Sequence, residues 1–460
     1  MVTAHVFRHH ELADDLAAFA CTLDFATLPP SAVHEAKRRL IDSIGVAFGA
    51  WNCPPAAAAG RIAARTRAEP GATPFGSHRQ TSPDLAAFVN GILIRYLDYN
   101  DTYLSREPAH PSDNIAAALA AAELVGSTGS DLLGAIVLGY ELQCRLCDAV
   151  SIRARGWDHV VYGALSTSLL SARLFGLSPE QGRHAVALAA TPNVAIRQTR
   201  SGELSMWKGC AFANAARNGL LAAMLAQEGM TGPYDLFEGE FGYFKQVMGN
   251  FSLPPLGGDW MILRTYIKLY PVEYHAQSAV DAALHLRPQI GNTSIERVEI
   301  ASFDAAVDII GKDPEKWRPQ SRETADHSLP YCVAVALLDG RVTMHSFDDV
   351  HLHDRRVQDL LGRISLVRDA ELTAGYPAGI PNRLTITLAD GRTLQEQVAF
   401  PRGHAGNPME DHEVEAKFRS LIADGPLSGR EQAILDYVWT IDQEANVSRL
   451  FELLSIPDRT

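Results

Sequence analysis

The sequence predicts a mainly α protein in which a large helical domain is followed by a smaller α+β unit. The chain has 460 residues, 47% of them hydrophobic, which is enough for two domains with substantial cores. The first 250 or so residues read as successive helices punctuated by Gly and Pro. After a Pro- and Gly-rich loop at 251–258 the pattern changes, and alternating strand patterns appear between the helices.

An early helix is predicted from a clear amphipathic pattern. The charged residues Glu35, Lys37, Arg38 and Arg39 lie largely on one side, and the apolar residues fall on a stripe on the other. That stripe consists of Val33, Ala36, Leu40, Ile41, Ile44 and Phe48. We therefore expect this helix to pack inward.

A boundary between two helices is predicted at residues 176–181. Gly176 can close one helix, Ser178 can cap the next, Pro179 suits its first position and Gln181 its third. Small residues are dense at 116–122 and 211–216, which lets helices approach closely. These features predict a compact, largely buried bundle.

The second unit is predicted to begin near Thr265. Residues 295–300 alternate in part, whereas residues 384–388 alternate cleanly and meet a turn before 392–398, which predicts a hairpin. Helical patterns at 276–286 and 331–338 make this unit α+β. From Met409 the chain returns to helix, including 430–440, and we expect this tail to pack on the first domain.

Composition narrows the classes of function. The formal net charge of −13 argues against a nucleic-acid partner, because phosphate binding usually needs a basic face. Residues 1–8 lack a basic segment followed by an apolar one, and no run approaches the roughly 18 apolar residues of a membrane span. We therefore expect a soluble, cytoplasmic protein with no nucleic-acid or membrane partner.

The six cysteines are too sparse for a disulfide framework. Cys144 and Cys147 have the C-x-x-C spacing that, with a third thiolate, could hold an iron–sulfur cluster of the kind used by some hydro-lyases. They lie in a stretch with apolar residues at helical spacing and no glycine-rich loop, so we interpret them as core residues. The cluster is kept as a remote alternative.

The most informative segment is RYLDYNDTY at 95–103, followed by AHPSDN at 109–114. It places the acids Asp98 and Asp101, the hydroxyl of Thr102 and the imidazole of His110 just before an alanine-rich run. The Pro after His110 and the Asp-Asn pair before Ile115 predict a turn into a helix, with His110 near its start. We interpret this segment as the rim of an active site.

Four further polar residues stand in apolar or small-residue settings and allow two readings each. His159 is either a satisfied structural histidine or a second imidazole for acid/base chemistry. Lys208 reads alone as a surface lysine, but a buried ammonium would need an anionic partner. Lys268, at the expected domain boundary, either snorkels or binds a ligand. Tyr331 opens an apolar helix, where core packing is the default.

Together these segments resemble the MmgE/PrpD family, which includes 2-methylcitrate dehydratases, cis-aconitate decarboxylases and iminodisuccinate epimerases. The resemblance spans almost the whole chain and is carried, in order, by LDYNDTY with HPSDN, GWDHV, MWKGCAFANAARNG, IKLYPVEYHAQS and ADHSLPYCVAVALLDG. It implies a large all-helical domain from residues 1–264, completed by the C-terminal helices 404–460, and a smaller α+β lid domain, residues 265–403. It also implies a homodimer with a cleft between the domains, and catalysis with no cofactor, metal ion or iron–sulfur cluster.

The resemblance also implies the residues of the site. Asp101 and His275 match positions in the family's motifs to which we give supporting, substrate-binding roles. The catalytic positions match Asp98, Thr102, His110, His159, Lys208, Lys268 and Tyr331.

The expected reaction is the dehydration of a small tricarboxylate, 2-methylcitrate and also citrate, because the longer motifs look most like the dehydratase branch. Elimination of water needs a base, an acid and cations that stabilise the enediolate-like carboxylate. We expect His110 and His159 to transfer protons, with either one as the base, and Lys208 and Lys268 to stabilise charge.

The other residues have auxiliary roles in this hypothesis. Asp98 and Thr102 would orient the site, and Tyr331 would bind or protonate the substrate. Decarboxylation of cis-aconitate and epimerisation of iminodisuccinate are alternatives, because the same residues could serve them. A non-catalytic helical scaffold is a remote alternative that leaves the gathered Asp, His and Lys motifs without a role.

Overall fold

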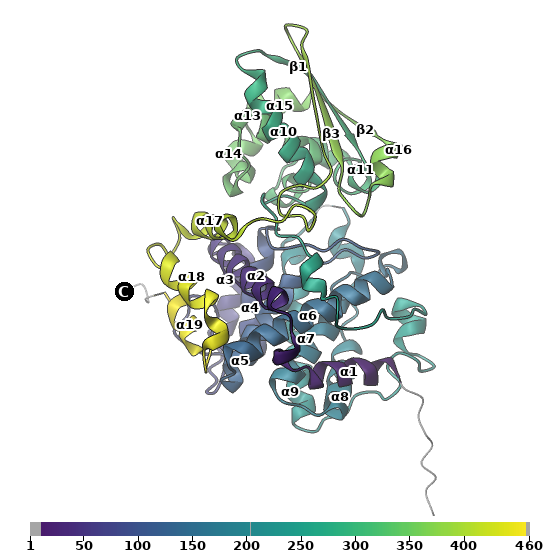
Figure 1. Cartoon of the computed structure of the whole chain (residues 1–460), viewed down its shortest axis with the longest axis vertical. Coiled ribbons are helices and arrows are strands. Elements are labelled where there is room, and N and C mark those ends of the chain that lie inside the picture. Colours follow the sequence, from purple (N-terminus) through teal and green to yellow (C-terminus); the bar gives the residue numbers. More distant parts are fainter. Residues whose placement is uncertain (1–10, 203, 457–460) are drawn as a thin grey trace, which may run out of the picture.

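The computed structural model describes residues 11–202 and 204–456. A helical body carries a smaller unit that contains the sheet (Figure 1), which confirms the predicted mainly α fold with an α+β part. Residues 1–8, where the sequence predicts no leader, lie outside the described ranges. Within those ranges, no helix combines the length and the apolar character that a membrane crossing requires.

In the part of the chain that the structure describes, the body contains nine α-helices from the N-terminal half and three near the C-terminal end. Those of the N-terminal half are α1 (Leu12–Thr22), α2 (Pro30–Gly49), α3 (Pro54–Ala63), α4 (Pro83–Tyr96), α5 (Ile115–Val125), α6 (Gly129–Ala149), α7 (Val161–Leu174), α8 (Pro179–Ala190) and α9 (Ala211–Gln227). The C-terminal ones are α17 (Asp411–Ile422), α18 (Glu431–Trp439) and α19 (Ser448–Leu454).

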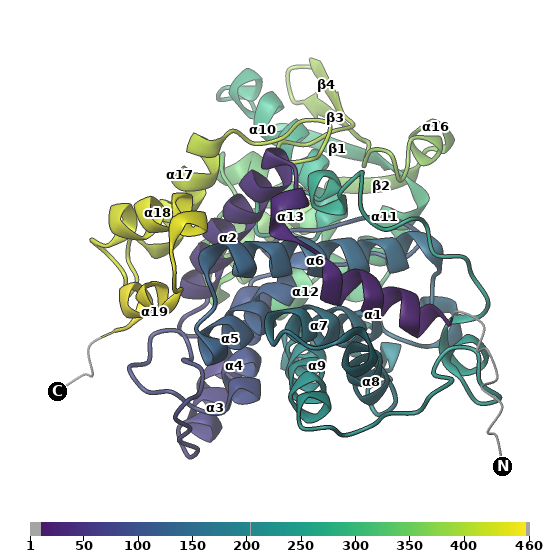
Figure 2. The same cartoon turned by 60° about the horizontal axis from the view of Figure 1, so that its bottom comes forward.

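The C-terminal helices α17 and α18 pack beside α2 (Figure 2), and α19 packs on α18. This packing corrects one expectation about α2. Arg38 and Arg39, predicted on the side away from the core, are buried because the C-terminal segment and residue Thr265 cover them. Arg38 donates to Asp411 and to the carbonyl of Met409, and Arg39 pairs with Glu35 at 2.8 Å. The predicted apolar stripe of α2 is buried, apart from Val33 at its start.

Small residues permit the close helix contacts of the body. The predicted capping box of α8 is present, with Ser178 and Gln181 each accepting from the other's backbone N–H. Between α7 and α9, a Cβ at Gly219 would lie only 2.0 Å from the Thr167 hydroxyl oxygen, so only glycine fits there. Cys144 and Cys147 are fully buried in α6, as predicted, and burial raises the pKa of both thiols.

The α+β unit has four strands in the order β2-β1-β3-β4. These are β1 (Ile295–Ser302), β2 (Ile364–Arg368), β3 (Asn382–Leu388) and β4 (Thr393–Val398), and β3 and β4 form the predicted hairpin. β1 is antiparallel to β3 and parallel to β2, a strand that the sequence pattern did not indicate.

One helix precedes the first strand of this sheet, and the others lie between β1 and β2 or between β2 and β3. The helix α10 packs on β3 and β4, and α13 packs on α10 and α15. The helices are α10 (Gln277–Ile290), α11 (Asp304–Ile310), α12 (Arg322–Ala325), α13 (Leu329–Asp339), α14 (Asp349–Leu352), α15 (Arg355–Leu361) and α16 (Ala370–Ala374).

Among the described residues, a small cluster of buried apolar side chains lies among α7, α8 and α9, and two large clusters accompany the two parts of the molecule. The larger one joins the first nine helices to α17, α18 and α19, and the other lies almost entirely within residues 266–388. This arrangement supports the domain boundaries predicted at 264/265 and 403/404, which we keep as a proposal. We call residues 11–264 with 404–456 the body and residues 265–403 the lid.

Candidate active site

A cavity of about 250 Å³ lies between the body and the lid. The body contributes residues that follow α4 and residues of the loops at 153–159 and 197–208, and the lid contributes residues 268–275, 308–316 and 327. Its charged and imidazole side chains are Arg95, Asp98, Glu107, His110, Arg153, His159, Arg197, Arg200, Lys208, Lys268, Glu273, His275, Asp308, Asp313, Lys316 and His327. The cavity therefore gathers polar residues from segments that are far apart in sequence.

A short backbone pairing joins the body to the lid at this cavity. The N–H of Thr102 donates to the carbonyl of Tyr266 at 2.9 Å, and the N–H of Tyr266 returns a bond to Thr102 at 2.8 Å. This pairing brings Asp98, before Thr102, next to Lys268, just after Tyr266. The two segments singled out in the sequence thus meet by main-chain hydrogen bonds.

Asp98 is the charged centre of the site. Its carboxylate pairs with Arg95, with the Lys268 ammonium at 3.3 Å and with the Lys208 ammonium at 3.9 Å. Burial by itself would raise the pKa of this carboxyl, but the charges of Arg95, Lys268 and Lys208 outweigh it and hold the pKa well below its usual range. Asp98 is therefore ionised and fixes these cations in place.

The backbone at Asp98 also has an unusual conformation. Its φ is 51°, in the left-handed region that non-glycine residues rarely adopt, although Asp tolerates it better than most. The conformation directs the Asp98 carbonyl to the Lys268 ammonium, which donates to it at 2.6 Å. The Lys268 side chain has no solvent exposure. Burial lowers the pKa of Lys268, and Asp98 opposes that change.

His110 is held in one neutral form. Its Nδ1 lies 2.8 Å from the carbonyl of Asp101, which can only accept, so Nδ1 carries the proton. Its Nε2 then accepts from the Arg95 guanidinium at 3.0 Å, and the Thr102 hydroxyl lies 3.1 Å from Nδ1. Burial, followed by the charges of Arg95 and Lys268, lowers the pKa of His110 well below its usual range.

His159 has a different arrangement, because one of its nitrogens is left free. The Nδ1–H donates to the Asp158 carboxylate at 2.8 Å, and the buried Nε2 has no hydrogen-bond partner among the described residues. Asp158 also accepts from Arg200 at 3.0 Å; burial would raise the pKa of Asp158, but Arg200 and His159 lower it. The His159 and His110 rings lie 6.0 Å apart, centroid to centroid. An ionised carboxylate thus holds an imidazole with an available lone pair.

Lys208 lies in a second charged group that includes lid residues. Its ammonium is 3.6 Å from Asp326 and 3.2 Å from Nδ1 of His327. The His327 ring contacts Asp326 at 2.5 Å and Asp98 at 3.5 Å. Asp98, Asp326 and His327 are close enough together to hold a metal ion. Their carboxylates are already neutralised by the lysines and Arg95, so an ion would have to displace those contacts.

His275 lines the lid side of the cavity. Its Nδ1–H donates to Glu273 at 2.7 Å, and its Nε2 lies 3.5 Å from the Tyr376 hydroxyl. Burial would raise the pKa of Glu273, but His275 lowers it to about 2. The ring also packs against Phe303 and Tyr376. His275 therefore resembles His159 in having a carboxylate partner, but its second nitrogen is near a hydroxyl.

Asp101 and Tyr331 are placed behind the cavity. Asp101 is fully buried and accepts from the Ser112 N–H at 2.9 Å and the Tyr140 hydroxyl at 2.7 Å. Tyr331 is not among the described residues that line the cavity; its hydroxyl donates to the carbonyl of Ser346 at 2.8 Å within the lid core. The structure thus brings six of the seven predicted catalytic residues to one cavity, together with His275, and leaves Tyr331 in the packing of α13.

Sequence reasoning did not select several cations and one imidazole that line the cavity. His327 stands inside the quoted ADHSLPY motif, and Arg200 lies eight residues before Lys208, so both were within reach of motif comparison. Arg197 and Lys316 lie in short charged segments that look like ordinary surface loops. Their place at the cavity depends on tertiary packing.

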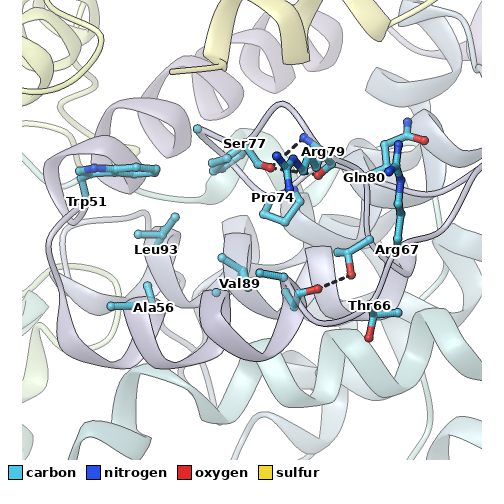
Figure 3. Close-up of a pocket in the computed structure, with 17 residues that line it drawn as sticks. Trp51, Ala56, Thr66, Arg67, Pro74, Ser77, Arg79, Gln80, Val89 and Leu93 are labelled. Atoms are coloured by element: carbon cyan, nitrogen blue, oxygen red, sulfur yellow. Dashed lines mark hydrogen bonds between the residues drawn. The ribbon is translucent and has the colours of Figure 1, made fainter. Parts of the chain in front are cut away.

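A second cavity, of about 520 Å³, lies in the body between α3, α4 and the loop 64–82. Figure 3 shows apolar side chains, including Trp51 and Leu93, at one end and Arg67 and Gln80 at the other. It is larger, but no carboxylate or imidazole is among the described residues that line it. The chemistry-bearing residues are therefore at the smaller cavity.

Comparison with known sequences gives matches over most of the chain. The MmgE/PrpD N-terminal domain matches residues 14–255, and the MmgE/PrpD C-terminal domain matches residues 270–443. Among curated proteins, a 2-methylcitrate dehydratase of Cupriavidus necator is 32% identical over 88% of each chain. One of Escherichia coli K12 is 31% identical over 86% of this chain and 87% of its own. A cis-aconitate decarboxylase-like protein of Aspergillus oryzae, oryM, is 27% identical over 96% of both chains.

Proposed function

This chain belongs to the MmgE/PrpD family, and from that premise we propose that it is a hydro-lyase that dehydrates 2-methylcitrate to 2-methylaconitate. Citrate, which would give cis-aconitate, is the second expected substrate. Relatives named 2-methylcitrate dehydratase cover most of the chain and support the choice of reaction. The charge and geometry of the cavity support the choice of substrate class and the roles given below.

The charges around the cavity suit a small polyanion. Its described lining contains seven lysine and arginine side chains, and two of them, Arg197 and Lys316, have no ion pair with a described residue. A volume of about 250 Å³ suits a ligand the size of a tricarboxylate. An anionic substrate would offset the cost of keeping these cations together in a partly buried site.

The observation that carries the mechanism is that Nε2 of His159 has no hydrogen-bond partner among the residues that the structure describes. Because Asp158 accepts the Nδ1 proton, the Nε2 lone pair is available to remove a proton from the carbon beside a substrate carboxylate. Asp158 then stabilises the imidazolium that forms. His159 is therefore the base of this proposal, a choice that the sequence left open between two histidines.

His110 is the proposed acid. Its pKa is lowered by burial and by the charges of Arg95 and Lys268. A bound polyanion counteracts the effect of these two charges on the pKa. Substrate binding therefore favours protonation of Nε2 and draws Arg95 toward the substrate. The proton then goes to the departing hydroxyl group, which leaves as water, while the electron pair of the broken C–H bond forms the new double bond.

Lys208 and Lys268 are proposed to stabilise the negative charge that develops on the substrate carboxylate. Both are buried, and both are oriented by Asp98. Fixed charges in a site shielded from water stabilise a transition state more than mobile ones do. Thr102 supports His110, and Asp101 holds the loop that carries it. We give Tyr331 no contact with the substrate in this scheme.

Decarboxylation of cis-aconitate is the second candidate, because the oryM relative aligns with 96% of this chain. The same lysines would stabilise the carbanion left by carbon dioxide, and the acid would protonate it. Epimerisation of iminodisuccinate would also use the base and the acid in turn. The residues alone do not separate these reactions.

The test is direct. Purified protein, treated with a chelator, is incubated separately with 2-methylcitrate, citrate, cis-aconitate and iminodisuccinate, and the products are identified by mass spectrometry. We expect 2-methylaconitate from 2-methylcitrate, with a lower rate on citrate. Turnover of cis-aconitate or iminodisuccinate alone would replace the proposed reaction, and turnover of none of the four would reject it.

Two further properties belong to this proposal. We propose a cytoplasmic homodimer, on the strength of the family resemblance. Light scattering coupled to gel filtration should give twice the 50.0 kDa mass of one chain. A mass of 50 kDa at micromolar concentration would contradict the dimer.

A further inference from the structure

The cations at the cavity fall into two groups according to their partners. Five of them have a carboxylate within 4 Å: Arg95 and Lys268 with Asp98, Arg153 with Glu107, Arg200 with Asp158, and Lys208 with Asp326. Two others, Arg197 and Lys316, have no ion pair and no side-chain hydrogen bond with any described residue.

Of these two, Lys316 is the more informative because it is buried. Its residue exposure is 8%, whereas Lys312 in the same segment is exposed to solvent. Burial, and then the charge of Lys208, lower the pKa of Lys316, and the carboxylates of Asp326, Asp313 and Glu273 oppose this change from beyond ion-pair distance. A lysine in a largely buried position without an ion-pair partner is costly, and proteins usually pair such groups with an anion. No ion pair within 4 Å joins Lys316 to a carboxylate of the described residues, so the position is suited to an anion that enters the cavity.

The lid holds the Lys316 backbone firmly in place. Lys316 lies in the short helical turn Pro314–Trp317. The indole N–H of Trp317 donates to the carbonyl of Gly311 at 2.8 Å. The Ser328 hydroxyl, at the start of α13, donates to the Lys316 carbonyl. Anchors on both sides of the residue fix the point from which the ammonium reaches the cavity. Arg197 reaches the same cavity from the body.

We propose that Lys316, assisted by Arg197, binds a substrate carboxylate that takes no part in the elimination, and thereby selects tricarboxylates over dicarboxylates. This inference rests on the proposed function for the identity of the reacting carbons. Lys208 and Lys268 serve the carboxylate next to the carbon that loses its proton. Among the described residues, the ammonium on the lid and the guanidinium on the body are the two lining cations without an ion pair, so they complete the site for a further carboxylate.

The binding experiment uses an unreactive tricarboxylate, so that it does not depend on turnover. Calorimetry measures the binding of tricarballylate, which has no hydroxyl group to lose, and of methylsuccinate, which lacks one of its acetate arms. We expect Lys316→Gln to weaken tricarballylate binding by about 30-fold or more and methylsuccinate binding by less than about threefold. Lys312→Gln is the matched control and should change neither, and Lys316→Arg should restore most of the affinity.

The kinetic experiment tests the role of Lys316 in turnover. The variant Lys316→Gln should raise KM for 2-methylcitrate by a similar factor and change kcat by less than about threefold, since the residue is remote from the reacting atoms. It should not affect KM for 2,3-dimethylmalate, in which a methyl group replaces the remote acetate arm. Its thermal unfolding midpoint should be unchanged or higher, because an unpaired buried charge is removed.

The outcomes separate the two proposals. Equal weakening of both ligands by Lys316→Gln, or none, would overturn the inference, as would a wild-type protein that binds no tricarballylate. A wild-type protein that binds tricarballylate through Lys316 but does not dehydrate 2-methylcitrate would reject the proposed reaction and keep the carboxylate site.

Discussion

On the body wall of the cavity, Asp158 holds His159, and Nε2 of this imidazole has no hydrogen-bond partner among the described residues. On the lid wall, Glu273 holds His275, and Nε2 of this second imidazole lies 3.5 Å from the Tyr376 hydroxyl. Both pairs consist of an acid with a lowered pKa and an imidazole. Only the body pair has a lone pair that nothing in the described chain occupies. The surroundings of the ring, rather than the carboxylate–imidazole pair itself, therefore distinguish a proposed base from a positioning group.

The largest effect is expected from Asp158→Asn, which tests the body pair. Arg200 keeps the remaining oxygen as its acceptor, so the new amide N–H faces Nδ1 of His159 and forces the proton onto Nε2. With no lone pair facing the cavity, kcat should fall by about 10³-fold. Nitrogen NMR of the imidazole should show the change of tautomer in the folded protein.

A loss of less than about tenfold in that variant, with the tautomer changed as described, would mean that His159 is not the base. Retention of the original tautomer would mean that Asp158 does not set it.

The next largest effect is expected from Lys268→Met, compared with Lys417→Met. Both lysines are buried beside a carboxylate, Asp98 at 3.3 Å and Asp42 at 2.7 Å, but Lys417 does not line the cavity. Lys268→Met should lower kcat by about 100-fold. Lys268→Met should lower the free energy of unfolding less than Lys417→Met does, because Asp98 keeps Arg95 and Lys208 as partners.

The control should behave in the opposite way. Lys417→Met should lower the free energy of unfolding by about 3 kcal/mol and leave kcat within about threefold. Urea unfolding and steady-state kinetics measure the two quantities. If both variants lost activity in proportion to their stability, the proposed role of Lys268 would be reduced to a structural one.

A smaller effect is expected from Glu273→Gln, which tests the lid pair. We expect kcat to fall by less than about tenfold, because His275 is a positioning group in this proposal. A fall as large as that of Asp158→Asn would remove the distinction between the two walls.

The same variant should change how stability depends on pH. The folded-state pKa of Glu273, about 2, lies below its ordinary value of 4.5. Its stabilisation is therefore complete above pH 4.5 and is lost as the pH falls toward 2. Glu273→Gln should lower stability at neutral pH and make the decline between these two pH values shallower, as measured by thermal unfolding.

The smallest effect is expected from Tyr331→Phe. The hydroxyl donates to the carbonyl of Ser346 inside the lid, so kcat and KM should stay within about twofold of the wild type. The free energy of unfolding should fall by about 1 kcal/mol because one buried hydrogen bond is lost. A large drop in kcat with little change in stability would restore the catalytic role that the resemblance gave to Tyr331.

Local sequence patterns predicted much of the fold. The capping box at Ser178, the hairpin of β3 and β4 and the core position of Cys144 depend on neighbours that are close in sequence, and all three were correct. The strand β2 was missed because it pairs in parallel with β1 across about 60 residues of sequence. Arg38 was predicted on the outer side of its helix because the helix that covers it lies more than 370 residues away in the sequence.

The site was predictable in its motifs but not in its charge balance. His110, His159, Lys208 and Lys268 were selected by resemblance, and the structure places them around one cavity, while their roles stay predictions. Lys316 shares a short charged segment with the exposed Lys312, and only the packing of the lid buries one of them and not the other. The free nitrogen of His159 likewise depends on contacts that no local pattern encodes.

The helical body is interrupted in the sequence by the whole lid, and its last helices, α17 and α18, pack on α2 near its start. During synthesis on the ribosome, Asp42 in α2 is made long before Lys417, its buried counter-ion. Part of the surface of the N-terminal helices therefore stays exposed until almost the entire chain has emerged from the ribosome. The strands and helices of the lid are contiguous in sequence, so the lid can fold before the body is complete.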